Sequence, residues 1–436
     1  MILSVVAIMV SGCRKSDYIL ADEYVLIKDS GNGTGTTTWN AGEKYLLDGK
    51  VYVNDGQILT IEPGTTIYAK TGQGENASAL IVARGGKIMA QGTVEKPIIF
   101  TVEGDDLMGS VPVEADGLWG GVIILGNAPV NSENQESFIE GIPFGEPRAT
   151  YGGTNPDDDS GILKYISIRH SGTSLSAGNE INGLTLGGVG RNTLIEYVEV
   201  IANRDDGFEF FGGTVNARHL VAAFCEDDAF DFDQGYTGNC QYLIGIQNIS
   251  TGDLIMEFSD RENHPTTQPV IANGTFIGRG SSANGQVLRF DNSSSGTIIN
   301  SIFLNQKNGL EIEYSGNQLD SYQQFLSENL VINSNLFYHV GNNSALQIFG
   351  VYSNVSDNIT EQDQIFKAYF EQGDNAIFDP GITYEQPYNL IPQNTGYGLP
   401  AEAPNIWFES TGFKGSVNEQ NWLKGWTLLD QANLIE

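Results

Sequence analysis

Two acidic segments, one repeat apart, are the part of the sequence best suited to chemistry. Residues 205–212 read DDGFEFFG, and residues 227–234 read DDAFDFDQ, at an offset of 22 residues. If the chain winds into a solenoid, the acids of the two segments stack at about 4.8 Å. Carboxylates at that spacing repel by roughly 3 to 4 kcal/mol at an effective dielectric of about 20. Such a wall must hold a cation, take up protons, spread into water or pair with the available arginines, which are Arg204, Arg261 and Arg289.

Three hypotheses account for this acidic wall, and the simplest is a solvated face without a site. Another is a divalent cation site, with Ca²⁺ the expected ion because hard carboxylate oxygens suit it. Its ligands would be Asp205, Asp206, Asp227, Asp228, Asp231 and Asp233. The third is a polysaccharide-active enzyme, a hydrolase or a lyase, that uses paired carboxylates as acid and base. Its catalytic candidates would be Asp206, Glu209, Asp228 and Asp231.

The lack of known catalytic motifs argues against catalysis. The sequence has no Gly-His-Gly and no Arg-x-Lys element of the kind that polygalacturonases carry. His170 and His219 are the histidines nearest the acidic segments, and both are expected to be structural. Residues 187–190 (GGVG) are not followed by a helix pattern, so they do not form a phosphate loop. We therefore expect binding rather than catalysis, and no dinucleotide cofactor.

The elements that position the acids are short strands that recur between residues 165 and 349. Side chains alternate along a strand, so one set should point into the solenoid. This set contains Leu184, Phe208, Phe230, Met256, Leu288, Leu310 and Leu346, each followed two residues later by another apolar residue. The residues between them should point outward: Thr185, Glu209, Asp231, Glu257, Arg289, Glu311 and Gln347. The predicted binding strip consists of Glu209, Asp231, Glu257, Arg289 and Glu311.

A second series of strands lies between these segments, and three of its members end in asparagine: Asn273, Asn300 and Asn333. Stacked asparagines can satisfy one another through a side-chain amide ladder, so a structural role is expected. The register also sets Cys225 near the end of one strand and Cys240 near the start of the next, beyond disulfide reach. We predict two unpaired, buried thiols.

The N-terminal half carries a pattern of short strands and glycine turns that resembles a known family. The segments are LTIEPGTTI at 59–67, GGKIMAQGT at 85–93, PIIFT at 97–101 and WGGVIILG at 119–126. They are similar to turns of right-handed β-helix lipoproteins of Bacteroidetes, and residues 421–427 (NWLKGWT) resemble the same family's C-terminal signature. The resemblance implies an all-β, right-handed parallel β-helix, a solenoid with a long side loop at 130–160 and a C-terminal cap of mixed helix and loop.

The C-terminal region is expected to close the solenoid, because the last coil would otherwise expose strand edges and core side chains. Residues 360–371 predict a helix, with Thr360 and Asp363 as a capping box. Trp422 and Trp426 are expected to cover the core, with an aromatic platform for a sugar as the alternative.

The N-terminus resembles the signal of a bacterial lipoprotein. An apolar run at 2–10, too short to span a bilayer, precedes Ser11-Gly12-Cys13, which is similar to a lipobox. The resemblance implies cleavage before Cys13, lipidation of that residue, and an address at the outer membrane, facing the cell surface. The predicted organisation is a signal peptide at 1–12, the lipidated cysteine and a flexible tether at 13–41, the β-helix at 42–350 and the capping region at 351–436.

Net charge restricts the partners. The value of −32 argues against nucleic acid and against charge-driven binding to anionic lipid. We therefore predict a lipid-anchored β-helix that binds a ligand or another envelope protein through its acidic face. The expected partners are a glycan or a TonB-dependent transporter, and the expected cofactor is Ca²⁺.

Overall fold

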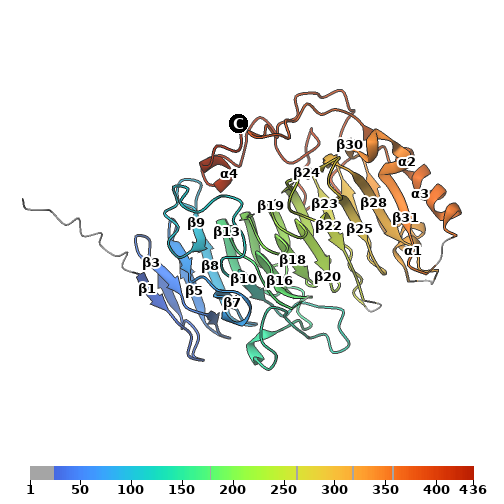
Figure 1. The fold of residues 1–436 in the computed structure, drawn as a ribbon. Coiled ribbons are helices and arrows are strands. Elements are labelled where there is room, and N and C mark those ends of the chain that lie inside the picture. Colours follow the sequence, from blue (N-terminus) through green and yellow to red (C-terminus); the bar gives the residue numbers. More distant parts are fainter. Residues whose placement is uncertain (1–23, 177, 262–263, 317–318, 356–357) are drawn as a thin grey trace, which may run out of the picture.

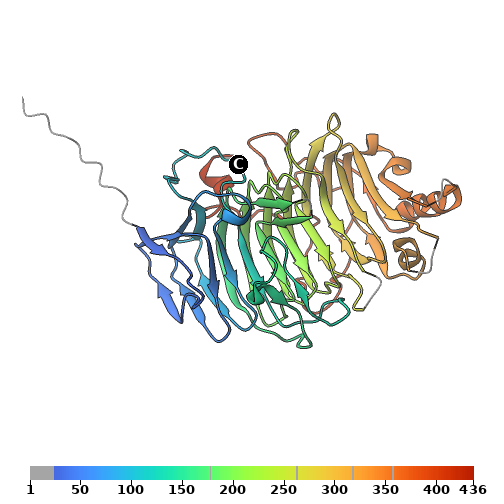
Figure 2. The same cartoon turned by 60° about the horizontal axis from the view of Figure 1, so that its bottom comes forward.

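The computed structural model describes residues 24–176, 178–261, 264–316, 319–355 and 358–436. Within them the chain winds through coils that stack along one axis, from the blue strands to the orange ones (Figures 1 and 2). The predicted signal peptide and Cys13 lie outside the described residues. In the part that is described, no helix has both the length and the apolar character that crossing a membrane requires.

Parallel strands form the walls of the solenoid, as predicted, and they are arranged in three columns. The first is a 10-stranded sheet whose parallel pairings join one coil to the next. Its strands are β4 (Lys50–Val53), β7 (Ala79–Val82), β10 (Val122–Leu125), β16 (Leu184–Gly187), β18 (Phe208–Phe211), β20 (Phe230–Asp233), β22 (Leu254–Phe258), β25 (Gln286–Phe290), β28 (Asn308–Glu313) and β31 (Phe349–Tyr352).

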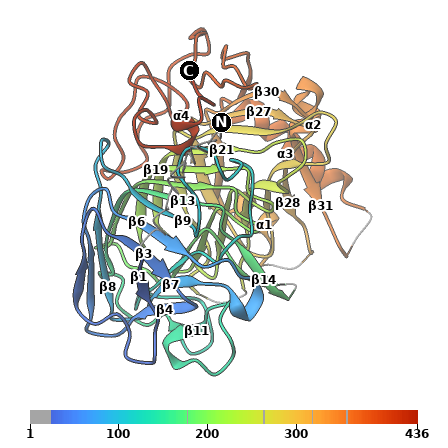
Figure 3. The same ribbon diagram turned by 60° about the vertical axis from the view of Figure 1, so that its left-hand side comes forward.

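The second and third columns belong to one 18-stranded sheet, because four long strands bend and contribute to both. These are β13 (Gly161–Arg169), β17 (Leu194–Ile201), β19 (Asn216–Ala223) and β21 (Asn239–Ile246). The second column also contains β2 (Thr37–Trp39), β5 (Ile58–Ile61), β8 (Lys87–Gln91), β23 (Val270–Ala272), β26 (Gly296–Ile299) and β29 (Leu330–Asn333). The third also contains β1 (Tyr24–Ile27), β3 (Lys44–Leu47), β6 (Thr66–Ala69), β9 (Ile98–Val102), β24 (Thr275–Gly280), β27 (Ile302–Gln306), β30 (Leu336–Val340) and β32 (Ala376–Ile377). Figure 3 shows the coils from the N-terminal side.

Each long strand turns its corner at one residue that is left out of the strand register. These residues are Tyr165, Tyr197, His219 and Tyr242, with φ values of 52°, 56°, 58° and 63°. A left-handed backbone lets the chain change direction within a single residue. We call this row of four side chains the bend column.

Aromatic and branched side chains fill the interior in the predicted alternation. Phe208 stacks on Phe230 with ring centroids 5.4 Å apart, and Phe210 stacks on Phe232 at 5.0 Å. The inward orientation is confirmed for the buried residues Leu184, Phe208, Phe230, Met256, Leu288 and Leu310. It is wrong for Leu346, which lies in α2 (Ala345–Ile348) and is 68% exposed. Because a turn of helix precedes the last strand, the column continues at Phe349 instead.

The solenoid starts earlier than predicted. Strand β1 pairs with β3 and β2 pairs with β5, so the segment from Tyr24 onward is already part of the β-helix. Trp39 anchors this coil, since it is 2% exposed and stacks on Tyr45 with ring centroids 5.0 Å apart. The prediction of a flexible tether is therefore wrong for residues 24–41.

Helix α3 (Thr360–Gln372) closes the last coil. Its Phe366 and Phe370 pack on Phe349 of the final strand, with ring centroids 5.0 and 5.3 Å away. The predicted helix is confirmed, but the capping box is wrong: Asp363 accepts a hydrogen bond from the Val351 N–H instead (3.2 Å). A second short helix, α1 (Ser321–Leu326), packs beside β29.

The chain after β32 returns along the solenoid as a strap, which we define as residues 378–436 (Figure 1). It contains α4 (Leu428–Gln431) and crosses the bend column, where Trp426 meets Tyr165 at 5.6 Å and Trp422 meets His219 at 4.9 Å. The predicted role of the two tryptophans as a cap on the core is therefore wrong. The strap covers outward-facing apolar side chains of the third column, among them Ile201, Val221 and Ile244.

Asn273 and Asn300 hold the strap. The Asn273 amide donates to Thr411 Oγ1 and to the Phe413 carbonyl (both 3.1 Å), and Asn300 exchanges two hydrogen bonds with Ala401 (2.9 and 2.7 Å). Among the described residues no hydrogen bond joins one of these asparagines to the next, so the predicted amide ladder is wrong. The two cysteines, Cys225 and Cys240, are buried and unpaired, as predicted.

Candidate functional site

The outward-facing residues of the first sheet lie in one register, as predicted. Glu209 pairs with Asp231 across β18 and β20, Asp231 pairs with Glu257, and Glu257 pairs with Arg289. Arg289 pairs in turn with Glu311. The predicted strip is therefore a continuous row on the outer face of the first sheet.

The predicted side loop folds over part of this row. Residues 130–160 carry a small hairpin of β11 (Ser137–Phe138) and β12 (Thr150–Tyr151). A second hairpin, of β14 (Thr173–Ser176) and β15 (Asn179–Ile181), lies nearby. Both are drawn onto the sheet because it presents apolar side chains outward; the resulting cluster contains Ile81, Ile123, Ile139, Ile142 and Ile181. As a consequence Glu209 is only 5% exposed, so the prediction that it faces solvent is wrong.

Carboxylates from successive coils converge beneath and beside this cover. Three groups of acids each place one oxygen per residue within 4.8 Å of the others. The groups are Asp205, Asp206 and Asp227; Asp206, Glu209 and Asp231; and Asp227, Asp228 and Asp253. Neighbouring groups share a residue, so we treat these seven side chains as one acidic cluster. It contains every predicted metal ligand except Asp233, and all four predicted catalytic candidates.

Backbone and amide groups fix several of these acids. The Asp228 N–H donates to Asp206 Oδ1 (2.8 Å), and the Leu254 N–H donates to Asp228 Oδ1 (2.7 Å). Each bond joins one coil to the next, so the turn before each strand repeats the same contact. Asn182 occupies the equivalent turn one coil earlier, and its amide donates to a carboxylate oxygen of Glu209.

Two buried oxygens at the cluster have no hydrogen-bond partner: Asp231 Oδ1 and Asn182 Oδ1. Both atoms can only accept, because a carboxylate and an amide carbonyl carry no proton to donate. A buried acceptor without a donor calls for a water, a proton or a cation. Carboxylate and amide oxygens are the ligands that Ca²⁺ prefers, so the residues present fit the predicted ion.

Burial and mutual repulsion raise the pKa values of the buried acids in the cluster. Burial is the largest cause for both Glu209 and Asp231, followed by repulsion from Glu140 for the first and from Glu257 for the second. The pKa of Asp205 rises to about 8 for the same reasons. The carboxyls whose pKa values rise furthest are Asp206, Glu209, Asp228 and Asp231. At neutral pH the cluster must therefore bind protons or a cation.

Arginine neutralises the far end of the row but not the cluster. Arg289 binds Glu257 (2.7 Å) and Asp291 (2.8 Å), which confirms it as a counter-charge. Arg204 instead binds Asp116 at 2.9 Å. In the part of the chain that the structure describes, no ion pair joins a lysine or arginine to any of the seven acids.

Four predicted site residues lie apart from the cluster, and Glu257 is one of them because it is paired with Arg289. Asp233 Oδ1 accepts from the Gln234 N–H (2.5 Å), Glu311 accepts from the Gln286 amide (3.0 Å), and Arg289 is occupied by its ion pairs.

Two acids at the site were missed by the sequence analysis. Asp253 precedes its strand as Asp227 does, so extending the alignment by one coil would have found it. Glu140 lies in the covering loop, where burial raises its pKa to about 7 and it comes close enough to Glu209 to repel it. This loop has no periodicity, so no register could have placed Glu140.

A parallel β-helix with a covered acidic cluster on its first sheet is the class of protein that fold and site define. Residues 31–376 match the family described as the pectate-lyase-like beta helix domain, and the chain belongs to that family. No curated protein and no solved structure matches the chain.

Proposed function

We propose that this chain is a lipid-anchored outer-membrane protein that binds a ligand or an envelope partner and holds Ca²⁺ in its acidic cluster. The observation that carries the calcium proposal is the convergence of Asp206, Glu209 and Asp231, whose oxygens lie within 4.8 Å of one another. Two oxygens bound to one Ca²⁺ at about 2.3–2.6 Å can be no more than roughly 5 Å apart. The spacing therefore suits direct coordination by a single ion.

Bound Ca²⁺ would connect consecutive coils. Asp206 and Glu209 come from one coil, Asp231 comes from the next, and the unpartnered oxygen of Asn182 comes from the one before. The ion would offset the repulsion among these acids, which the described arginines do not. It would also fix the sheet surface on which the covering loop rests.

Calorimetric titration with CaCl₂ tests this proposal on the full chain after treatment with EGTA. We expect saturable binding of Ca²⁺ and little heat from MgCl₂, because Mg²⁺ demands a tighter octahedral set of ligands. Glu209→Gln should abolish the calcium heat. Glu361→Gln, which removes an exposed acid of α3 far along the chain, is the matched control and should leave it unchanged. A wild-type chain that gives no heat would contradict the proposal.

The lipid anchor and the cell-surface location are proposed from the lipobox-like residues that end at Cys13. A Cys13→Ser variant should lose metabolic labelling by fatty acid and leave the membrane fraction. Protease treatment of intact cells would then decide on which side of the outer membrane the chain lies. Co-purification from cross-linked membranes tests for a TonB-dependent transporter as the partner.

The second candidate function is a polysaccharide-active enzyme. The family's pectate-lyase-like description supports it, as do buried carboxyls whose raised pKa values let them hold a proton near neutral pH. Asp206, Glu209, Asp228 and Asp231 would supply acid and base, although the cover restricts access to Glu209. If Asp231→Asn and Glu209→Gln leave turnover of a broad polysaccharide panel at the wild-type rate, these residues are not catalytic.

A further inference from the structure

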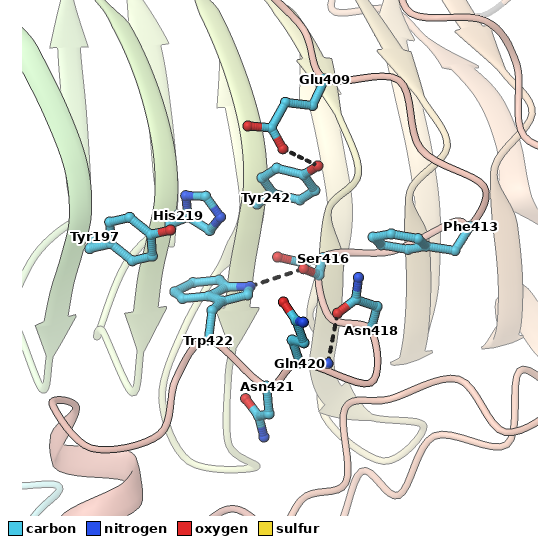
Figure 4. Close-up of a pocket in the computed structure, with 10 residues that line it drawn as sticks. All are labelled: Tyr197, His219, Tyr242, Glu409, Phe413, Ser416, Asn418, Gln420, Asn421 and Trp422. Atoms are coloured by element: carbon cyan, nitrogen blue, oxygen red, sulfur yellow. Dashed lines mark hydrogen bonds between the residues drawn. The ribbon is translucent and has the colours of Figure 1, made fainter. Parts of the chain in front are cut away.

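A cavity of about 400 Å³ lies on the 18-stranded sheet, between the bend column and the strap (Figure 4). The sheet contributes Tyr197, His219 and Tyr242, and the strap contributes Ser416, Gln420 and Trp422. Cavities of this volume accommodate small ligands. The acidic cluster belongs to the other sheet, so the two sites share no residue.

The wall of the cavity is a column of stacked rings. Tyr197 and His219 are 4.1 Å apart at an interplanar angle of 5°, and His219 and Tyr242 are 4.7 Å apart at 25°. Trp422 stands nearly perpendicular to them, at 78° to His219. Its indole N–H donates to the Ser416 carbonyl (3.0 Å), which fixes the ring beside the opening. The cavity therefore has a rigid aromatic corner.

The aromatic residues of this wall have an unusual backbone conformation. Bulky residues rarely adopt a left-handed backbone, which costs about 1 kcal/mol or more per residue. Three coils in succession nevertheless place Tyr197, His219 and Tyr242 there, with φ between 56° and 63°. At the next two bends the chain uses asparagine, Asn273 and Asn300, which tolerates this conformation better. Three of the four aromatic residues of the bend column thus line the cavity, and the fourth, Tyr165, packs against Trp426 instead.

Two buried polar atoms at the cavity have no hydrogen-bond partner: His219 Nδ1 and Ser416 Oγ. Burial, with help from the charges of Arg218 and Lys164, lowers the pKa of His219 to about 3, so the imidazole is neutral. A neutral ring nitrogen and a serine hydroxyl are both satisfied by groups that donate and accept. A hydroxyl-rich ligand offers such groups.

The rim of the cavity is polar and carries no lysine or arginine among its described residues. It includes the exposed amide of Gln420 and the carboxylate of Glu409, which accepts from the Tyr242 hydroxyl (3.0 Å) and binds Arg218 (3.1 Å). Because Arg218 is occupied by Glu409 and the described lining carries no other cation, the rim offers an anionic ligand no free counter-charge.

We propose that this cavity binds a neutral hexopyranose unit of an oligosaccharide. The apolar C–H face of the sugar would lie against Trp422, since aromatic rings supply large apolar surface beside polar groups. Its hydroxyls would reach Ser416 Oγ, His219 Nδ1 and the Gln420 amide. This proposal goes beyond the calcium site and does not depend on it.

Tryptophan fluorescence of the full chain, titrated with oligosaccharides, tests the proposal because Trp422 lines the cavity. The panel contains neutral manno-, gluco-, galacto- and xylo-oligosaccharides, with oligogalacturonate as the anionic comparison. We expect a saturable change with a neutral hexose oligomer and none with oligogalacturonate. Ser416→Ala and Gln420→Ala should each weaken binding roughly three- to tenfold, the usual effect of losing one hydrogen bond. Calcium titration of both variants should remain as in the wild type.

Glu419→Ala is the matched control, because Glu419 is exposed on the same stretch of strap but does not line the cavity. It should bind the sugar like the wild-type chain. No response to any neutral oligosaccharide, a preference for oligogalacturonate, or wild-type affinity in both Ser416→Ala and Gln420→Ala would each overturn the proposal. If Ser416→Ala raises the Tm and no sugar binds, the cavity holds only water and the proposal fails.

Discussion

Two columns of like side chains run along the outside of this solenoid. The side chains of one column attract one another, whereas those of the other repel one another. In the bend column the rings of Tyr197 and His219 stack at 4.1 Å. In the acidic cluster Glu209 and Asp231 stand in the same relation on neighbouring strands. Stacked rings attract one another, whereas carboxylates repel. A parallel β-helix sets equivalent residues of successive coils side by side, so it multiplies whichever interaction the sequence repeats.

The difference separates two kinds of repeat. A column of rings can be retained for stability alone, so it acquires a binding role only through the strap that shapes a cavity over it. A column of acids lowers stability unless something outside the column balances it. The acidic cluster therefore points to a bound ligand by itself, whereas the bend column does not. The following experiments test this difference between a stabilising and a destabilising column.

Removing the strap's main contact with the bend column should have the largest effect. Trp426 is fully buried, 5.6 Å from Tyr165 and 6.3 Å from Tyr197. Trp426→Ala should therefore lower the free energy of unfolding by about 3–5 kcal/mol in urea denaturation. Trp407→Ala is the control on the same strap; Trp407 is half-buried beneath Arg218, so we expect a loss of only about 1 kcal/mol. Equal losses would show that the bend column does not depend on Trp426.

Neutralising an acid of the cluster should raise the free energy of unfolding rather than lower it. In EGTA, Asp231→Asn should stabilise the fold by up to about 3 kcal/mol, because it removes repulsion at coil spacing. The same change should abolish stabilisation by calcium. Asp291→Asn is the contrasting control, because Asp291 is paired with Arg289 and its loss should destabilise by about 1 kcal/mol. Destabilisation by both variants in EGTA would remove the basis for a charge-strained cluster.

The cluster should make stability depend on pH in the absence of calcium. The pKa of Asp205 in the cluster is raised to about 8 in the folded state, and that of the neighbouring Glu140, in the covering loop, is raised to about 7. Such groups take up protons on folding, so stability is present at low pH and is lost as pH rises from about 4 to 8. The slope reaches about 1.4 kcal/mol per pH unit for each proton. Denaturation at pH 5, 6, 7 and 8 should show this slope in EGTA and a flatter one in millimolar CaCl₂; parallel slopes would contradict proton–calcium competition.

The bend column should make stability fall as the pH is lowered, which is the reverse of the effect of the cluster, and this effect should be smaller. The pKa of His219 is lowered to about 3 in the folded state, so below about pH 6.5 only the unfolded state takes up the proton. The free energy of unfolding of the wild-type chain should therefore fall by about 0.7 kcal/mol between pH 7 and pH 6. His219→Phe keeps a ring in the stack and should remove that loss. Tyr197→Phe is the control, because the pKa of Tyr197 is about 12 and lies outside this pH range. This variant should show the same loss of stability as the wild-type chain.

Much of the first sheet could be predicted from the sequence, because a solenoid repeats and strand side chains alternate. The row from Glu209 to Glu311 follows from those two rules alone. Leu346 broke the pattern because its neighbours look like a strand, while the chain spends one turn of helix before β31 begins. Alignment of KYISI, EYVEV, RHLVA and QYLIG at 164, 196, 218 and 241 would also have found the bend column.

The cover and the strap could not be predicted, because both depend on contacts between distant, non-periodic segments. The Tyr151 hydroxyl, from the covering loop, donates to Gln234, the residue directly after β20 (2.7 Å). No spacing rule connects these residues. The same is true of the burial of Glu209, which changed a solvated acid into a member of a charge-strained cluster.

The strap also sets an order of events during biosynthesis. Arg169 donates to Gln431, 262 residues later, and the Leu428 N–H donates to Glu199, 229 residues earlier. Coils made early must therefore wait for the final residues of the chain before their outer apolar side chains are covered. Contacts this far apart in sequence slow folding. A chain that stops before the strap would leave the apolar outer face of the third column exposed. Exposed apolar surface of this kind is recognised by chaperones and proteases.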